Sequence, residues 1–334
     1  MYISQQAKQH ARVARENGAW IVSMPINIAL IKYMGKRSLQ RNLPLNASLS
    51  YTVGHCWSQV SIECIDGLHD QCVADITLDH SGFLSDKAIE RFILHAKRIK
   101  TMLHCSQAFL IKTGNNFPAS CGLASSASSF AALSLVLVRC LEEITKAKQP
   151  MSIKAIAELS QQASGSSCRS FYVPWALWEP DQGVKALTLP YERLLHAVVV
   201  VDQSAKAVSS SQAHQRVMQS SLMKGRDDRA EKRLTDLLHA LGNSCWKKAF
   251  HLIREEFLDM HALFETANPA FSYMTDASFS VLRYVEAYWK KHQDGPWITL
   301  DAGPNVHLFF RPDQRQIVDE MISQLAEKHV IISS

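Results

Sequence analysis

The sequence lacks the motifs by which many catalytic and metal sites are recognised. It contains no CxxC pair, no Cys/His spacing typical of zinc, no HExxH, no GxxxxGK[ST] loop and no GxGxxG fingerprint. Its eight cysteines are scattered along the chain. We therefore expect neither structural zinc nor a disulfide framework, and we expect most cysteines to be reduced, buried side chains.

Long apolar runs are also missing. The longest nearly apolar stretch, Phe130–Val138, has nine residues, far fewer than the roughly 18 needed to cross a bilayer. The N-terminal segment MYISQQAKQHARVARENGAW has basic residues but no apolar signal region. We interpret it as a short extra helix on a cytoplasmic protein.

The composition is that of an ordinary folded protein. The 334 residues include 47% hydrophobic and 20% charged residues, and the length predicts about two domains. A net charge of +5 suits a phosphorylated small substrate as well as a nucleic acid. The basic residues are spread out and no nucleic-acid-binding motif is present, so we expect no nucleic-acid partner and no membrane partner.

Hydrophobic periodicity predicts a mixture of strands and helices. Alternation predicts a half-buried strand at Leu49–Val53 and a meander through Gln59–Ile65 and Val73–Leu78. Helical spacing predicts helices, and apolar runs predict further strands. The predicted helices are 86–103, 130–141, 151–163, 230–241, 249–264, 278–291 and 312–328, and the further strands are 20–24, 108–112, 197–201, 297–300 and 306–310. This irregular order indicates an α+β fold, and we place a domain boundary near residue 190, giving domains 1–190 and 191–334.

The loop NNFPASCGLASSASSF, which begins at Asn115, is the most informative segment. A strand ends, Pro118 and Gly122 shape a turn, and small residues open a helix whose free backbone N–H groups point outward. Such a helix start binds phosphate, and its serine hydroxyls offer donors or a ligand for Mg²⁺. An ordinary helix start with serine caps explains the same residues.

Three further groups of residues could take part in binding or catalysis, although each also has an ordinary structural explanation. The first is a basic cluster that could clamp phosphate oxygens or be a solvated turn: Asn27, Lys32, Tyr33, Lys36 and Arg37. The second is SGSSCRS (164–170), where Arg169 fits a carboxylate or phosphate, or serves the structure. The third is Asp301 in LDAGPN, which could be a catalytic carboxylate or could cap its own turn.

Taken in order, these segments resemble the motifs of the mevalonate diphosphate decarboxylases, a family of the GHMP kinase superfamily. The family's motifs look like NIA(x)(I/L)KYWGKR with LP(x)NSSLS, NNFPTAAGLASSA(A/S)G, GSGSACRS and FDAGPN. Here they stand as NIALIKYMGKR with LPLNASLS, NNFPASCGLASSASS, ASGSSCRS and LDAGPN. The resemblance covers the chain from about Pro25 to Phe310.

The resemblance implies a role for each matching residue. Lys32, Tyr33 and Lys36 would face the substrate diphosphate, Arg169 would hold the substrate carboxylate, and Asp301 would lie at the 3-hydroxyl. Asp301, Arg169 and Lys32 would form the catalytic set. Asn27, Ser164, Ser166 and Ser210 would complete the substrate site. The nucleotide phosphates would bind Ser120, Cys121, Gly122, Leu123, Ala124, Ser125 and Ser126, and Ser126 would reach the metal. By default we regard His261 and the other histidines as structural or exposed.

The resemblance also implies a fold and an activity. The expected fold is a GHMP kinase-like two-domain fold, with an N-terminal ribosomal protein S5 domain 2-like half and a C-terminal ferredoxin-like α/β sandwich. The expected reaction is ATP- and Mg²⁺-dependent decarboxylation of mevalonate 5-diphosphate to isopentenyl diphosphate in isoprenoid biosynthesis, by a homodimer. A 3-kinase or a monophosphate decarboxylase, acting on mevalonate or its 5-phosphate, and a non-catalytic nucleotide-binding paralogue are the alternatives.

Several residues depart from the family pattern. Met34 replaces a tryptophan, Ser38 an aspartate and Ser129 a glycine, and Ala213–His214 replaces a glycine–methionine pair. Val173-Pro174 lies where the family has two glycines. These departures leave the nucleotide preference and the phosphorylation state of the substrate open.

Overall fold

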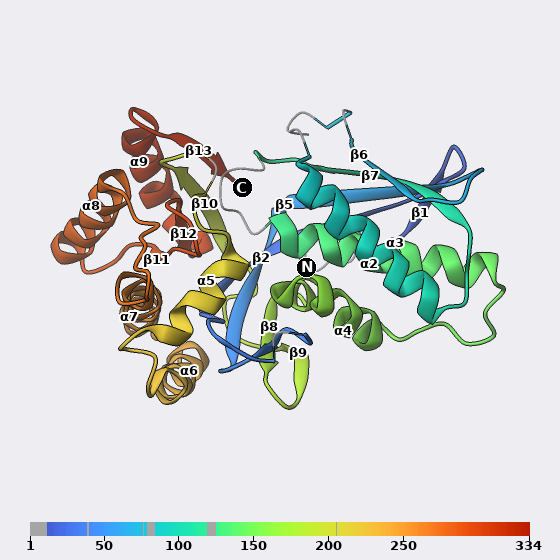
Figure 1. Ribbon diagram of the computed structural model, residues 1–334. Helices are drawn as coiled ribbons and strands as arrows, with labels where there is room; N and C mark the ends of the chain where they lie inside the picture. Colours follow the sequence, from blue (N-terminus) through green and yellow to red (C-terminus); the bar gives the residue numbers. More distant parts are fainter. Residues whose placement is uncertain (1–11, 39, 76, 79–83, 119–124, 205) are drawn as a thin grey trace.

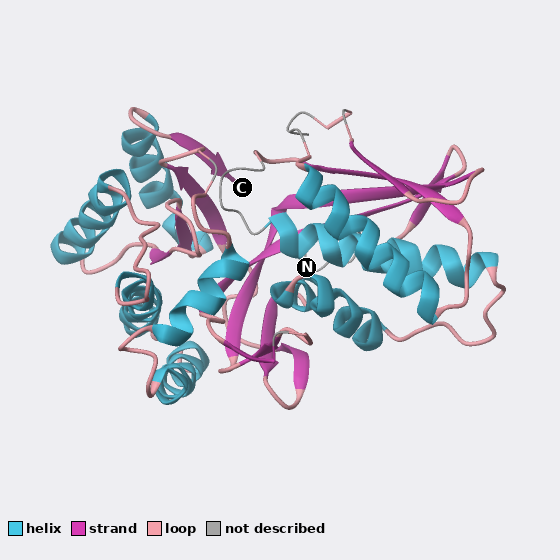
Figure 2. Ribbon diagram, viewed as in Figure 1, coloured by secondary structure: helices cyan, strands magenta, loops and turns pink. Residues whose placement is uncertain are grey.

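The computed structural model describes residues 12–38, 40–75, 77–78, 84–118, 125–204 and 206–334. Helices and strands alternate irregularly, which confirms the predicted α+β class (Figure 2). The first half of the chain forms a seven-stranded sheet and the second half a four-stranded sheet. The two sheets and their helices lie side by side, joined by two long strands (Figure 1).

The larger sheet has the order β1-β2-β5-β7-β6, and β8 and β9 extend it from one part of β5. Its strands are β1 (Ala14–Glu16), β2 (Ala19–Ile31), β5 (Ser48–Ile65), β6 (Gln71–Ala74), β7 (Ala108–Asn115), β8 (Trp175–Glu179) and β9 (Gly183–Leu187). A small hairpin joins β3 (Lys36–Ser38) to β4 (Leu43–Pro44). The predicted meander is wrong, because β6 pairs with β7 in parallel. A helix between these two strands returns the chain to the same end of the sheet, as parallel pairing requires.

Strands β2 and β5 reach into both halves because they bend. Pro25 is paired with Trp57 but Ile26 is paired with Val53, so residues 54–56 of β5 bulge out of the ladder. Beyond the bulge, the alternating serine and threonine side chains of β5 are buried as well as the apolar ones. The predicted half-buried strand is therefore buried on both faces. The reason is that the segment around Arg169 covers its polar face, with the Thr52 hydroxyl donating to the carbonyl of Tyr172.

Three helices lie over the larger sheet: α2 (Asp86–Met102), α3 (Ser125–Ile144) and α4 (Ile153–Ala163) (Figure 1). Ser85 caps α2 by accepting a hydrogen bond from the Ala88 N–H. Helix α3 is apolar on nearly all sides because it packs between the sheet and the other two helices. After α4 the chain makes a short 3₁₀ helix, η1 (Gly165–Phe171), which carries Arg169.

The predicted N-terminal helix is wrong in its described part. Residues Ala14–Glu16 form β1 and pair with β2 through a two-residue turn, Asn17–Gly18, in which both residues have positive φ. Asn-Gly is the strongest short-range signal for such a hairpin, and it outweighs the weak helical character of the flanking residues. The preceding residues 1–11 lie outside the described part.

The smaller sheet has the order β11-β12-β10-β13 and is antiparallel throughout. Its strands are β10 (Leu195–Val200), β11 (Trp297–Thr299), β12 (Val306–Phe310) and β13 (Val330–Ser333). The helices of this half are α5 (Ser210–Arg216), α6 (Arg226–Gly242), α7 (Trp246–Glu265), α8 (Asp276–His292) and α9 (Arg315–Ala326), with η2 (Val217–Gln219) and η3 (Pro312–Gln314). The predicted helices and strands of this half are confirmed, whereas α5 and β13, and the β8–β9 hairpin of the first half, were not predicted.

One hydrophobic core crosses between the halves. Side chains of β2 and β5 beyond the bulge pack with those of β10, β12 and α7, including Ile28, Tyr51, Phe257 and Phe309. The predicted boundary at residue 190 lies between β9 and β10, and its position stays a prediction. Among the described residues, no helix is both long and apolar enough to cross a membrane. Four of the seven described cysteines are buried, and none of the seven is in a disulfide.

Candidate active site

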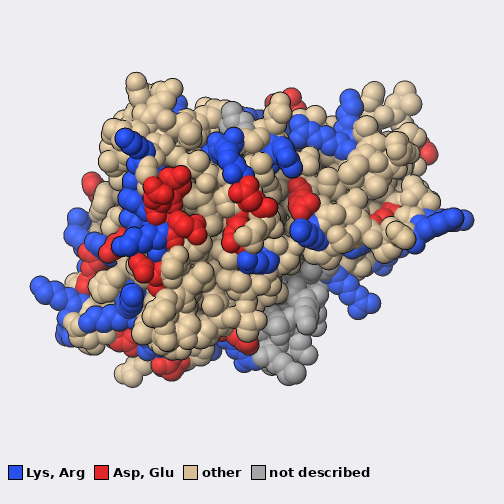
Figure 3. Space-filling model, turned by 90° about the horizontal axis from the view of Figure 1, so that it is seen from below, with Lys and Arg blue, Asp and Glu red and all other residues tan. Residues whose placement is uncertain are grey.

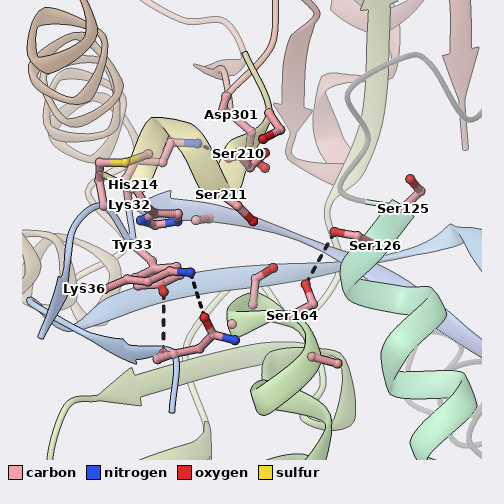
Figure 4. A pocket seen from close by; sticks show the side chains of 18 of the residues that line it. Lys32, Tyr33, Lys36, Ser125, Ser126, Ser164, Ser210, Ser211, His214 and Asp301 are labelled. Atoms are coloured by element: carbon pink, nitrogen blue, oxygen red, sulfur yellow. Dashed lines mark hydrogen bonds and ion pairs between the residues drawn. The ribbon is translucent and has the colours of Figure 1, made fainter. Parts of the chain in front are cut away.

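A cavity of about 590 Å³ lies where the two halves meet (Figure 4). The end of β2, helix α2, the starts of α3 and η1, helix α5 and the turn after β11 all contribute to its lining. The charged residues of the lining comprise five cations and one carboxylate: Lys32, Lys36, Arg91, Arg169, Lys206 and Asp301. On the outer face shown in Figure 3, by contrast, positive and negative side chains are interspersed. Positive charge concentrated in a cleft favours a polyanionic ligand.

Lys32 and Asp301 form an ion pair at one end of the cavity. Lys32 Nζ lies 2.7 Å from Asp301 Oδ1, and the lysine is almost fully buried whereas the carboxylate is 23% exposed. Burial alone would raise the pKa of Asp301, but the Lys32 ammonium, aided by Arg169, outweighs it and holds the pKa below its usual value. Asp301 is therefore a carboxylate, ready to accept a proton.

Buried residues next to the cavity hold both members of this ion pair in place. The Lys32 backbone N–H donates to Glu256 Oε1 (3.0 Å), and Glu256 is buried in ion pairs with Arg226 and Arg233. On the other side, His261 Nε2 donates to the Asp301 carbonyl (3.2 Å), since a carbonyl oxygen can only accept. Burial lowers the pKa of this histidine to about 3 and keeps it neutral. The predicted structural role for His261 thus agrees with its contact to backbone.

Arg169 is held in a fixed orientation by neutral partners. Its Nε donates to Asn27 Oδ1 (3.0 Å) and its Nη1 donates to Ser48 Oγ (2.8 Å). Asn27 in turn donates to Ser170 Oγ (2.8 Å). Among the described residues, no carboxylate forms an ion pair with this buried guanidinium. It can therefore receive an anionic group of a ligand.

A second basic group lies away from the ion pair. Lys36 Nζ donates to Asn42 Oδ1 (2.7 Å), and the Tyr33 hydroxyl donates to the Asn42 carbonyl (3.5 Å). The ring of Tyr33 packs against Trp178 and His214. Tyr33, Lys36 and His214 face the cavity together in Figure 4.

The third part of the lining is rich in hydroxyl groups. Ser125 and Ser126 open helix α3, and Ser126 Oγ lies 3.4 Å from Ser164 Oγ across the cavity wall. Ser166 on η1 and Ser210 on α5 also line the cavity. The predicted phosphate-loop residues Ser120, Cys121, Gly122, Leu123 and Ala124 lie outside the described residues.

Comparison with known proteins identifies the family. Residues 24–188 match the diphosphomevalonate decarboxylase-like N-terminal domain, and residues 196–333 match the mevalonate 5-diphosphate decarboxylase C-terminal domain. A crystal structure of a mevalonate diphosphate decarboxylase from Legionella pneumophila is 44% identical, with a TM-score of 0.89 over 94% of this chain and 100% of that one. The chain belongs to the mevalonate diphosphate decarboxylase family.

Two further relatives extend this finding. The diphosphomevalonate decarboxylase of Danio rerio is 29% identical over 311 residues, which cover 86% of this chain and 75% of that protein. A structure of MDDEF in complex with MVAPP, AMPPCP and magnesium is 23% identical, with a TM-score of 0.83 over 95% of this chain and 97% of that one. The predicted GHMP kinase-like two-domain fold of the decarboxylase family is confirmed.

The described residues that the family resemblance singled out converge on the cavity. All of them line it apart from Asn27, which instead holds Arg169. The structure pairs Lys32, which the resemblance placed both at the diphosphate and in the catalytic set, with Asp301 rather than with Lys36. Their roles toward ligands stay predictions.

Sequence reasoning missed several lining residues, among them Asn42, Arg91, Lys206 and His214. Arg91 comes from the middle of α2, and Lys206 Nζ donates to the Ala302 carbonyl beside Asp301. Neither lies in a motif that the family comparison used, and only the tertiary fold brings them to the site. His214 was visible only as a departure from the family pattern.

The lining fits a magnesium ion held mainly by nucleotide phosphates. The described residues contain no cluster of three or more His, Cys, Asp or Glu side chains that could hold a metal alone. Mg²⁺ in phosphoryl-transfer sites keeps water and phosphate ligands and takes few from the protein. The Ser126 hydroxyl, facing the cavity at the start of α3, is of the type that supplies such a ligand.

Proposed function

We propose that this chain catalyses the ATP-dependent decarboxylation of mevalonate 5-diphosphate to isopentenyl diphosphate, releasing ADP, phosphate and CO₂. Membership of the decarboxylase family supports the reaction class. The observation that carries the assignment is the convergence of the Asp301 carboxylate and the Arg169 guanidinium on one cation-rich cavity. A carboxylate, an alcohol and a diphosphate in one molecule match this set of side chains.

Asp301 would accept the proton of the 3-hydroxyl while the γ-phosphoryl group of ATP is transferred to that oxygen. An alcohol has a pKa of about 16 and an aspartate about 4, so prior deprotonation would cost about 16 kcal/mol. Proton transfer therefore has to accompany phosphoryl transfer, as general bases act in kinases. Lys32 holds the carboxylate in place and in its charged form.

Arg169 would bind the substrate carboxylate during this step and during the next. Loss of CO₂ breaks the C1–C2 bond, its electron pair forms the C2–C3 double bond, and the 3-phosphate leaves with the electrons of the C3–O bond. The phosphorylated oxygen thus replaces the electron sink that other decarboxylases take from an organic cofactor. Bound Mg²⁺ would neutralise charge on the phosphates. Ser126 would hold it, and the start of α3 would hold the nucleotide.

An assay that measures ADP and CO₂ separately tests the proposal. The substrates are mevalonate, its 5-phosphate and its 5-diphosphate, each with ATP and Mg²⁺. We expect equimolar ADP and CO₂, with the highest kcat/KM for the diphosphate. ADP without CO₂ would identify a 3-kinase, preference for the monophosphate a sibling decarboxylase, and neither product a binding protein.

The cytoplasmic location and the homodimeric state belong to the same proposal. The homodimeric state comes from the family resemblance, whereas the cytoplasmic location comes from the sequence itself. Light scattering coupled to size-exclusion chromatography measures the oligomeric state directly, and a monomer at micromolar concentration would contradict it.

A further inference from the structure

His214 lies at the end of the cavity that holds Tyr33 and Lys36, but neither the family resemblance nor the proposed mechanism gives it a role. It projects from α5, is 8% exposed and lines the cavity. Its ring lies 4.3 Å from the Tyr33 ring, and Figure 4 shows it beside Tyr33 and Lys36. A buried histidine that reaches a ligand cavity can bind a ligand directly.

The hydrogen bonding of His214 determines which ring nitrogen carries the proton. The Gly35 N–H donates to Nδ1 (3.2 Å), so Nδ1 is an acceptor. Burial, with the nearby cations Lys36 and Arg169, lowers the pKa of His214 to about 3, so the ring is neutral. A neutral imidazole that accepts at Nδ1 carries its proton on Nε2.

The two edges of the ring therefore have different surroundings. The Nδ1 edge faces the backbone of Gly35, which leaves the Nε2 edge to face the cavity that the residue lines. Gly35 has a positive φ, a backbone conformation that favours glycine, so the glycine determines this turn. The turn thus orients the ring, and the ring presents a single neutral N–H donor.

We propose that His214 Nε2–H donates a hydrogen bond to a phosphate oxygen of the substrate diphosphate, beside Lys36 and Tyr33. This inference rests on the proposed function. An N–H donor with no acceptor capacity on that edge suits a phosphate oxygen, and hydrogen bonds to charged groups are the stronger ones. His214 would then be a substrate-binding residue that adds affinity and direction without adding charge.

Two substitutions separate this role from support of the Gly35 turn. The amide of His214→Gln extends as far as Nε2 and can donate to the phosphate, whereas the amide of His214→Asn reaches only as far as Nδ1 and can accept from Gly35. We expect His214→Asn to raise the Kd and KM for mevalonate 5-diphosphate by about 10- to 100-fold, with kcat nearly unchanged. His214→Gln should stay within about fivefold of the parent.

The opposite pattern, with His214→Asn close to the parent and His214→Gln weakened, would show that His214 only supports the turn. Parent-like affinity in both variants would also overturn the proposal. Calorimetric titration with mevalonate 5-diphosphate gives Kd without turnover, so it can be read even if the protein releases no CO₂. In that case the proposed function fails independently. ¹⁵N NMR of the free protein between pH 5 and 8 should show Nε2 protonated and Nδ1 unprotonated.

Discussion

The two ends of the cavity hold their charged groups in different ways. At the reacting end, Lys32 and Asp301 are paired with each other, and buried Glu256 fixes the Lys32 backbone. At the phosphate end, Lys36 is held by the neutral amide oxygen of Asn42, and neutral His214 and Tyr33 lie beside it. Its ion pair keeps the Asp301 carboxylate ionised and oriented to accept one proton. The Lys36 ammonium is held by a neutral group, so its charge is available for a ligand.

The difference predicts separate kinetic effects at the two ends. Changes at the reacting end should lower kcat, because in the proposed mechanism Asp301 would act only as the hydroxyl loses its proton. Changes at the phosphate end should raise KM, because the diphosphate would be bound equally in the ground state and the transition state.

The largest expected effect is that of Asp301→Asn. The amide keeps the shape of the side chain but cannot accept the proton, so we expect kcat to fall by about 10²- to 10⁴-fold. ATP affinity should be nearly unchanged, because the proposed nucleotide site lies at the start of α3. Steady-state CO₂ release and calorimetric ATP binding measure the two quantities.

The exposed carboxylate of Asp313, paired with Arg311, provides the matched control for this variant. Asp313→Asn removes the same charge outside the cavity and should leave kcat unchanged. CO₂ release from Asp301→Asn at the parental rate would show that another group takes the proton.

Lys36→Met should produce the complementary effect. It removes the ammonium from the phosphate end and keeps most of the side-chain volume, so we expect KM for mevalonate 5-diphosphate to rise by about 10- to 100-fold. We expect kcat to change by less than about threefold, because no transition-state contact is lost. Initial rates at varied substrate concentration give both constants.

Lys185→Met is the control for charge alone. Lys185 pairs with Glu179 on the β8–β9 hairpin and does not line the cavity. If Lys36→Met lowered kcat as strongly as Asp301→Asn, the two ends would not act separately.

The sequence predicted the main charged residues of both ends but not how they are paired. Motifs identified Lys32, Lys36, Arg169 and Asp301 because each lies in a short, ordered segment. The pairing of Lys32 with Asp301 joins residues 269 positions apart and depends on the packing of β2 against the second half of the chain. Local patterns carry no such information.

The same limit explains the errors in the predicted secondary structure. Helices with strong apolar periodicity, such as α2 and α7, were predictable because their buried faces repeat along the chain. Strand β13 has only four residues, and its place beside β10 is decided by tertiary packing. At the N-terminus, Asn17–Gly18 is a local hairpin signal, and the positive φ of both residues turns Ala14–Glu16 back to pair with β2.

The two ends share one feature, which predicts how the chain responds to acid. Each contains a buried histidine with a lowered pKa: His214 at the phosphate end and His261 behind Asp301. A chain of three more, His55, His196 and His307, lies where β5 meets β10 and β12. His196 is 3.5 Å from His55 and 3.1 Å from His307, measured between ring nitrogens.

Because the unfolded chain binds protons on these histidines below their usual pKa of 6.5 and the folded chain does not, the free energy of unfolding should fall as pH drops from 6.5 toward 4. Each such histidine contributes about 1.4 kcal/mol per pH unit. Burial lowers the pKa of His55 to about 4, so His55→Asn should make the decline shallower by that amount. Urea unfolding of the parent and of His55→Asn at pH 7, 6 and 5 measures how the free energy of unfolding depends on pH. If the free energy of unfolding declined equally for parent and variant, His55 would bind its proton equally well in the folded and unfolded states. Burial of these rings would then not determine how the stability of the fold falls in acid.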